Sequence, residues 1–247
     1  MARIYTCDLH IHTCLSPCAE LDMHPSAIVR AALEKNLDII AVCDHCASEN
    51  ARYVIKAAAG TSLLVLPGME ATSSEEVHVV ALFESIEVLG LLQELIYANL
   101  RGENDEDVFG VQAIVNEAGE VEGFNPHLLI GASDIPLADI VGRVHELGGV
   151  AIASHIDRES FGVLGQLGFL PPDAAFDALE ISAGTGVAKA RRMYPDLDSY
   201  TFITSSDAHF IQDIGKAPAR MLLEAPSFGE IAMALKKTGG RTVLEET

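Results

Sequence analysis

Short apolar runs alternate with amphipathic stretches along most of the chain. Runs with the length and β-branched content of buried strands lie at residues 4–11, 37–44, 62–70, 77–83, 150–155, 178–182, 200–209 and 219–225. Helical periodicity is found at residues 25–36, 89–100, 134–149, 187–192 and 227–240. This alternation predicts one parallel α/β domain over residues 1–247, with a barrel favoured over an open sheet.

Residues that start and stop elements support this reading. Pro25 would occupy the first turn of its helix, where a missing N–H costs nothing, and Ser227 with Glu230 forms a capping-box pattern. Residues 109–126 are less regular. They fit either a hairpin that turns at Gly119 or a helix that breaks there.

Polar residues interrupt the apolar pattern at particular places. Regular alternation in the first strand would put Asp8, His10 and His12 on one face, and Cys7, Leu9 and Ile11 on the other. Further histidines and carboxylates follow later strands at their carboxyl ends: Asp44, His45, Glu70, His155, Asp207 and His209. His78 differs, because it stands at the beginning of its apolar run.

The shared position of these side chains indicates a site. Taken singly, a histidine at a strand end is usually a hydrogen-bonded structural residue, Glu70 could be a helix N-terminal carboxylate, and Asp44 could form a turn. The carboxyl ends of parallel strands in a barrel converge on one mouth, however. Imidazoles and carboxylates gathered there are costly to bury unless a cation neutralises them. We therefore expect a metal centre.

Composition and charge narrow the class of protein. The chain is 49% hydrophobic, enough for a sizeable core, and no apolar run is long enough to span a bilayer. Its start lacks the apolar region of a secretory signal, so we expect a cytoplasmic protein. Sixteen Lys and Arg against 36 Asp and Glu give a net charge of −20. Such a field should repel a long polyanion, so we expect a small phosphorylated substrate, no long nucleic acid and no membrane partner.

All five cysteines lie in the first 46 residues. An odd number of cysteines without a secretory signal argues against disulfides. Cys14 with Cys18, and Cys43 with Cys46, would also suit a four-thiolate zinc or iron–sulfur site. Strand geometry places Cys43 and Cys46 on opposite faces, which makes that alternative the weaker one.

Five motifs occur in an order typical of one family. The segments DLHIHT, VCDH, PGMEAT with VHVVALF, GGVAIASH and SSDAH together resemble the polymerase and histidinol phosphatase (PHP) domain, from the first strand to about residue 215. The resemblance implies a distorted seven-stranded β/α barrel related to the TIM barrel. It also implies two or three divalent metal ions, commonly zinc, manganese or iron, and cleavage of phosphate esters.

The resemblance also implies a ligand set. A first metal would be held by His10, His12, Glu70 and Asp207; a second by Glu70, His78 and His155; and a third by His45 and His209. Asp8 and Asp44 resemble the carboxylates that orient ligands in such sites. Cys18 stands where the family often has a His or Asp, and it could be a third-site ligand or a structural thiol, with His24 a weaker substitute.

The chemistry expected of such a centre is metal-dependent phosphoester hydrolysis. A bound divalent ion lowers the pKa of its water to about 7, and paired ions clamp the attacking and leaving oxygens. The resemblance assigns catalytic roles to Glu70, Asp207 and His209, and Arg158 is the first candidate for a phosphate contact. Arg191 and Arg192, and more weakly Lys216, are further candidates.

The substrate predicted on this basis is a small phosphomonoester or nucleotide-derived ester. Two alternatives stay open: a histidinol-phosphatase-like enzyme, and a non-catalytic metal-binding regulatory protein. Neither the substrate within this class nor the oligomeric state follows from the sequence.

Overall fold

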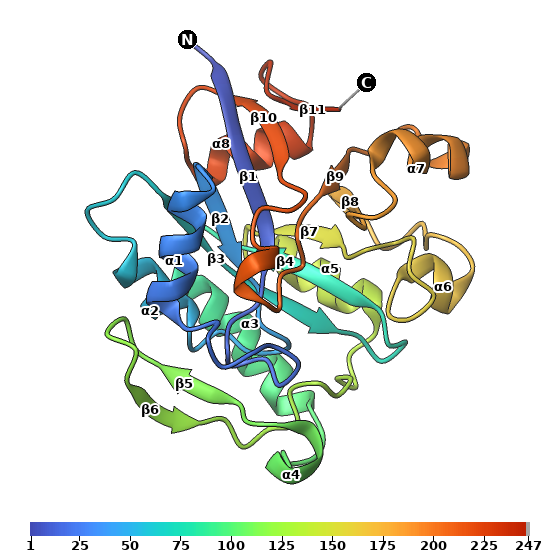
Figure 1. Ribbon diagram of the computed structural model, residues 1–247. Coiled ribbons are helices and arrows are strands. Elements are labelled where there is room, and N and C mark those ends of the chain that lie inside the picture. The colour runs from blue at the N-terminus through green and yellow to red at the C-terminus, as the bar shows by residue number, and fades with distance from the viewer. Residues whose placement is uncertain (246–247) are drawn as a thin grey trace.

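A nine-stranded mixed sheet forms the centre of the molecule and curves into a nearly closed barrel (Figure 1). The computed structural model describes residues 1–245. The strand order is β11-β10-β1-β2-β3-β4-β7-β8-β9. The strands are β1 (Arg3–Ile11), β2 (Ile39–Val42), β3 (Leu64–Thr72), β4 (His78–Leu82), β7 (Val150–Ala153), β8 (Ala178–Ile181), β9 (Phe202–Thr204), β10 (Ala219–Leu223) and β11 (Thr242–Leu244).

The sheet differs from the prediction in strand number and in direction. It has nine strands rather than seven, and it is not all parallel. The neighbours β1-β2-β3 and β7-β8-β9 are parallel, whereas β4 is antiparallel to both β3 and β7, and β10 is antiparallel to both β1 and β11. The segment after β9 approaches the end of β1, where the His12 N–H donates to the Ala208 carbonyl at 3.0 Å. This contact brings the two halves of the sheet together at the mouth.

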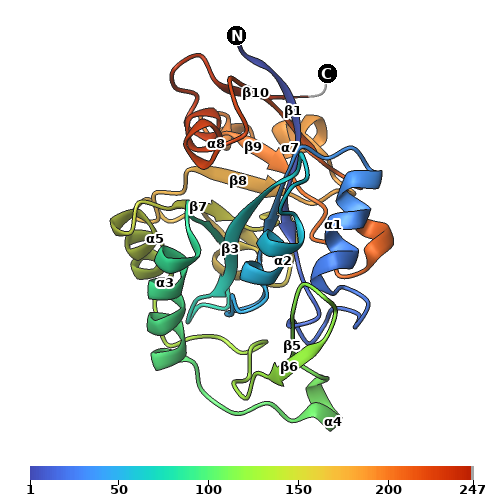
Figure 2. The same ribbon diagram turned by 90° about the vertical axis from the view of Figure 1, so that its left-hand side faces the viewer.

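Helices cover the outside of the sheet (Figures 1 and 2). They are α1 (Pro25–Glu34), α2 (Ala51–Ala57), α3 (Ile86–Asn99), α4 (Glu106–Phe109), α5 (Leu137–Glu146), α6 (Val163–Leu167), α7 (Val187–Met193) and α8 (Phe228–Leu235), with 3-10 turns η1 (Pro195–Leu197) and η2 (Ile211–Asp213). The predicted cap of α8 is present, because Ser227 Oγ accepts from the Glu230 N–H at 3.3 Å. Across the part of the chain that the structure describes, none of the helices combines the length and apolarity that crossing a bilayer requires.

A β-bulge in β1 changes which side chains share a face. The pairing of β1 with β2 shifts register between Asp8 and Ile11, so the strict alternation predicted for this strand is wrong. Cys7 and Leu9 pack in one apolar cluster with α8, whereas Ile11 packs in the other cluster with the outer helices. Bulges of this kind re-aim side chains near active sites. Here the irregularity includes His10, one of the two histidines at the end of the strand.

The irregular segment at 109–126 is a hairpin, one of the two forms the sequence allowed. Strands β5 (Ala113–Val115) and β6 (Val121–Phe124) pair antiparallel, and Gly119 in their turn has φ +84°, a value that glycine adopts without strain. The hairpin lies at the opposite end of the molecule from the two termini (Figures 1 and 2). It packs on the loop after β1, since the Ala113 N–H donates to the Cys14 carbonyl at 3.1 Å.

Candidate metal centre

The structure brings the predicted histidines and carboxylates together at one end of the barrel. They come from six strands or the loops directly after them, and nearly all are buried. They are His10 and His12 at the end of β1, His45 after β2, Glu70 in β3, His78 in β4, His155 after β7, and Asp207 and His209 after β9. Glu180 of β8 also lies here, although the sequence analysis did not select it.

His78 reaches this end because its strand runs the other way. β4 is antiparallel to β3, and His78 pairs with Thr72 at the carboxyl end of β3. The first residue of β4 therefore lies beside the last residues of β3, two positions beyond Glu70. The apparent exception in the sequence pattern is a consequence of strand direction.

The ligand atoms fall into three groups, each within 4.8 Å. The groups are His10, His12, Glu70 and Asp207; His45, Glu70 and His78; and His12, His45 and His209. The first group matches the predicted first metal site, and Glu70 belongs to two groups, as a bridging carboxylate would. His155 Nε2 lies 3.3 Å from Glu70 Oε1, beside the second group.

Hydrogen bonds fix the outer nitrogens of His10 and His12. Glu180 accepts from His10 Nδ1, with its oxygens at 3.1 and 3.2 Å. Ser16 Oγ donates its single hydrogen to Asp44 at 2.7 Å, so it accepts from His12 Nδ1 at 3.0 Å. In the neutral form of each ring, with the hydrogen on Nδ1, Nε2 has a lone pair directed inward. The two Nε2 atoms are 3.1 Å apart, a separation that needs a shared proton or a bound cation between them.

Several buried polar atoms of the centre have no hydrogen-bond partner among the described residues. They include Glu70 Oε1, His78 Nδ1 and His155 Nδ1. Glu70 Oε1 and His78 Nδ1 are 3.1 Å apart but lack hydrogen-bond geometry. Unpaired buried polar atoms are costly, and metal ligands are a common reason for them. The imidazole and carboxylate donors fit a divalent ion such as zinc, manganese or iron.

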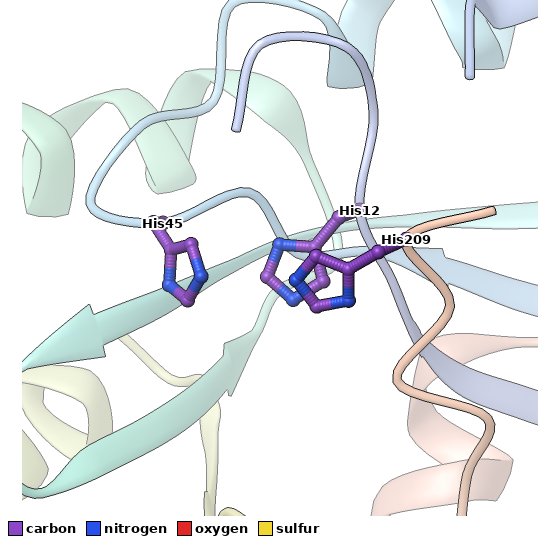
Figure 3. A group of neighbouring side chains, drawn as sticks. All are labelled: His12, His45 and His209. Carbon is purple, nitrogen blue, oxygen red and sulfur yellow. The ribbon is translucent and has the colours of Figure 1, made fainter. Parts of the chain in front are cut away.

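The third group, His12, His45 and His209, is drawn in Figure 3, and its members His45 and His209 line the cavity at the opening of the centre. The rings of His12 and His209 stack with centroids 4.1 Å apart, and the His45 ring lies 4.5 Å from that of His12. Cys18 is exposed at this opening and its side chain contacts His45, but it belongs to none of the three ligand groups. His24 lies elsewhere, at the start of α1, where its Nδ1 is 3.2 Å from Ser26 Oγ.

Burial and neighbouring charges shift the pKa values of the carboxylates and imidazoles in the centre. Burial favours the neutral acid, but His78 and His10 outweigh it and hold the pKa of Glu70 well below its ordinary value. Burial is likewise outweighed at Asp207, whose pKa is lowered by His10 and His12. Burial lowers the pKa of His78 to about 4 and of His209 to about 3. Glu70 and Asp207 are therefore ionised and His78 and His209 neutral at pH 7, which are the forms that bind metals. At His10 and His12 the neighbouring carboxylates outweigh burial and raise the pKa, to about 9 for His12, so a metal ion must displace a proton from these rings.

Four polar side chains hold the loops of the centre. Asp44 accepts from the Thr13 N–H at 2.7 Å as well as from Ser16, and so fixes the loop after β1. Asp8 accepts from the Ser206 and Gly215 N–H groups at 2.9 and 2.8 Å, and so fixes the connection from β9 to β10. Asp8 and Asp44 thus do orient the centre, mainly through backbone. Ser16 and Glu180 were missed, although Glu180 was detectable as a carboxylate within an apolar strand.

Two residues of the centre have strained backbone. His155 has φ +27° and Asp207 has φ +49°, values in the left-handed region that non-glycine residues rarely adopt. Such conformations cost about 1–3 kcal/mol each and cluster at functional sites. Their occurrence at two strand ends of the same mouth agrees with a site whose geometry takes precedence over stability.

Arg158 is the predicted arginine that the structure places at the centre. Its Nη2 lies 2.7 Å from Asp207 Oδ2, and its side chain is 46% exposed. It lines a cavity of about 210 Å³ together with Ile130, Phe161 and the ligand residues. Arg191 points elsewhere and donates to the Tyr200 carbonyl at 3.0 Å, and Arg192 and Lys216 line a separate groove.

The alternative four-thiolate site does not form among the described residues. Cys14, Cys43 and Cys46 are buried separately, and each thiol lies near a different backbone carbonyl. None of the five cysteines belongs to a group of ligands close enough to share an ion.

Several known proteins are similar to this chain in sequence or in fold. No family model matches the chain. The uncharacterized protein YqxK of Bacillus subtilis is 29% identical over 107 residues, which cover 41% of this chain and 27% of that protein. The lesion-specific endonuclease EndoQ of Pyrococcus furiosus superposes with a TM-score of 0.76 and 18% identity over 98% of this chain. The chain spans 58% of that endonuclease.

Two further structures share the fold. Endonuclease Q in complex with a 27-mer duplex that has an abasic lesion at the active site gives a TM-score of 0.75, again with 18% identity, over 98% of this chain and 58% of that one. A two-domain protein from Bacteroides vulgatus that contains a predicted PHP-like metal-dependent phosphoesterase gives 0.60 with 16% identity, over 99% of this chain and 66% of that one.

The endonuclease complex contradicts one prediction. A net charge of −20 led us to exclude long nucleic acids as partners, yet a protein with this fold over nearly the whole chain binds a DNA duplex. The argument was wrong because net charge describes the whole molecule, whereas binding depends on the potential at the contacted surface. Cations held in a cleft reverse that potential locally.

The fold agrees with the resemblance that the five motifs carried. Both the structural neighbours and the arrangement of the strand-end residues correspond to it. The predicted resemblance is thus confirmed at the level of the fold: this chain has the fold of the PHP-like metal-dependent phosphoesterases.

Proposed function

We propose that the chain is a metal-dependent phosphoesterase. The observation that carries the proposal is the buried cluster in which Glu70 belongs to two ligand groups. Divalent ions held there would lower the pKa of a water to about 7 and neutralise phosphate oxygens. In this proposal the ligands are His10, His12, Glu70 and Asp207 for one ion and Glu70, His78 and His155 for another, with a third ion at His45 and His209.

The residues of the chain have distinct tasks. Glu70 would hold the two ions together because its oxygens face histidines of both ligand sets: Oε2 lies 3.4 Å from His12 Nε2, and Oε1 lies 3.1 Å from His78 Nδ1. Arg158 lies on Asp207 and is partly exposed, so its guanidinium can pair with a non-bridging phosphate oxygen at the opening. His209 is partly exposed beside it and can contact the same phosphate when no third ion is bound.

The cavity favours a substrate whose reacting part is small. Its volume of about 210 Å³ is below the roughly 300–1,000 Å³ of pockets that enclose a whole drug-sized ligand. A phosphate with part of its sugar or alcohol would fill it. We propose a phosphomonoester or nucleotide-derived ester as the substrate class.

A second candidate is cleavage of a DNA strand. It is favoured by the likeness to endonuclease Q, which covers 98% of this chain at a TM-score of 0.76, compared with 0.60 for the two-domain PHP-like protein. That endonuclease is considerably longer than this chain, so activity on a lesion in DNA does not transfer with the fold alone.

Hydrolysis assays test the proposal. The protein loaded with zinc, manganese or iron would be offered p-nitrophenyl phosphate, nucleoside bisphosphates, histidinol phosphate and a DNA duplex with an abasic site. We expect hydrolysis of at least one ester, lost in Glu70→Gln together with bound metal. Glu84→Gln, on an exposed residue, is the matched control. Full metal occupancy without hydrolysis of any substrate would favour the non-catalytic metal-binding alternative.

A further inference from the structure

A basic groove lies at the seam where the two ends of the curved sheet face each other. One side is formed by α7 and β9, and the other by residues 216–220 with β11 (Figure 1). Its volume is about 450 Å³. β9 is the last strand in the sheet order, so one of its edges has no strand partner among the described residues.

The groove concentrates positive charge in an acidic protein. Four of the sixteen Lys and Arg residues line it and none of the 36 Asp and Glu does; these four are Lys189, Arg192, Lys216 and Arg220. All four are exposed. Lys216 is paired with Asp213, whereas the other three make no ion pair within residues 1–245. Three of the four cations therefore lack a counter-charge within the described residues, and an anionic ligand would supply one.

The groove adjoins the metal centre through one short connection. The connection from β9 to β10 carries Asp207 and His209, and Thr204 at its start and Lys216 near its end both line the groove. Asp207 is three positions after Thr204, so their Cα atoms are at most about 11 Å apart. Because Asp8 holds the Ser206 and Gly215 N–H groups, this connection has a fixed path between groove and centre.

The helix that supplies two of the cations is held in place. Arg191 stacks over the Phe202 ring at 3.9 Å, and its guanidinium donates to the Tyr200 carbonyl at 3.0 Å. Arg191 is therefore held in place by residues of the groove wall. Its neighbours on α7, Lys189 and Arg192, are left exposed at the groove.

We propose that this groove binds the phosphate backbone of a nucleic-acid strand whose reacting ester lies at the metal centre. The proposal rests on the phosphoesterase function of that centre. A strand with several phosphates can contact several of these cations at once, and each contact adds to the affinity because it releases counterions. The groove would also explain how a protein chain of net charge −20 binds a polyanion, because the nucleic-acid strand would contact the part of the surface that is positively charged.

Binding of a short fluorescein-labelled single-stranded oligonucleotide, followed by fluorescence anisotropy, tests the proposal. The variant Arg192→Gln/Arg220→Gln removes two groove cations. The control Arg30→Gln/Arg52→Gln removes two exposed arginines from α1 and α2 and changes the net charge equally. We expect roughly tenfold weaker binding for the groove variant, with the slope of log K against log salt reduced by about 1.4, since each phosphate contact on a single strand contributes about 0.7. The control should stay within about twofold of the unaltered protein.

Three results would overturn the proposal. One is equal loss of affinity in the two variants, another is no oligonucleotide binding by the unaltered protein, and the third is equally effective competition by a mononucleotide at the same total phosphate. Anisotropy reports binding whether or not the strand is cut. If binding depends on the groove cations but no ester is hydrolysed, the proposed phosphoesterase function is wrong and the groove proposal stands. If an ester is hydrolysed but binding does not depend on the groove cations, the groove proposal is wrong and the phosphoesterase function stands.

Discussion

The Nε2 atoms of His10 and His12 face each other at 3.1 Å, while the Nδ1 atoms of the same rings are held by Glu180 and Ser16. The outer hydrogen bonds prevent the rings from turning away, so the two Nε2 atoms need a proton or a metal ion between them. A divalent ion can bind both Nε2 lone pairs once the rings are neutral. The folded state should therefore gain stability from metal binding.

Metal binding is expected to raise the temperature of unfolding. At a free metal concentration of about 100 times Kd, the gain in the free energy of unfolding should be about 2.7 kcal/mol. Differential scanning calorimetry of chelator-treated protein with added zinc or manganese measures it. His10→Asn/His12→Asn should abolish the metal-dependent rise. His145→Asn, on α5 outside the centre, should retain it, and an equal loss in both variants would contradict the assignment.

Glu180 is expected to tune metal affinity without binding the ion. Its carboxylate accepts from His10 Nδ1 and also lies 3.3 Å from the His155 N–H, so it orients His10 and increases the basicity of its Nε2. Glu180→Gln keeps the shape and an acceptor but removes the charge. We expect metal affinity to fall about 10–100-fold.

Competition with a fluorescent chelator measures that loss. Glu84→Gln provides the control, because it removes one exposed carboxylate that has no side-chain partner among the described residues. Unchanged affinity in Glu180→Gln would show that the hydrogen bond to His10 is structural and does not tune the metal site.

Arg158 is expected to contribute to substrate binding and to the transition state. A hydrogen bond to a charged group is worth about 1.5–3 kcal/mol, so Arg158→Gln should lower kcat/KM about 10–100-fold. Arg158→Lys should restore part of the loss, because it keeps the charge but not the planar fork. Steady-state kinetics with the best substrate separate KM from kcat. Arg143→Gln on α5, whose partner is Glu146, should have kinetics close to those of the unaltered protein.

The sequence predicted the position of the site better than it predicted the sheet. His10, His45, Glu70 and His155 were selected because each follows an apolar run, and the strands do bring them to one mouth. That inference needs only the direction in which parallel strands end. It requires no knowledge of register, which explains why it survived the error in strand number.

Features that depend on pairing were not predictable from one sequence. The bulge at His10 arises from the register of β1 against β2, and the position of His78 arises from the reversed direction of β4. Both are properties of two strands together. The partner of Glu180 is a similar case: a carboxylate in an apolar strand is visible in the sequence, but only the folded sheet brings it to His10.

An ion pair far from the centre is expected to make stability depend on pH. Glu230 at the start of α8 accepts from Arg241 Nε and Nη2 at 2.8 and 2.9 Å and from the Glu224 N–H at 2.7 Å. The Arg241 guanidinium foremost, with this N–H, lowers the pKa of Glu230 below its ordinary value. A carboxyl whose folded pKa is depressed stabilises the fold above its unfolded pKa of about 4.3, and this contribution is lost as the pH falls through the folded pKa.

Glu230→Gln should therefore lower the midpoint of thermal unfolding by a few degrees at pH 7, and the difference from the unaltered protein should shrink below about pH 4. The scans should be made with a chelator present, so that protonation of the metal ligands does not contribute through bound metal. Glu84→Gln should show little difference at either pH, because that carboxylate has no partner among residues 1–245. If Glu230→Gln is destabilised as much at low pH as at pH 7, the charge of Glu230 contributes nothing to stability. The side chain would then act only through packing and hydrogen bonding.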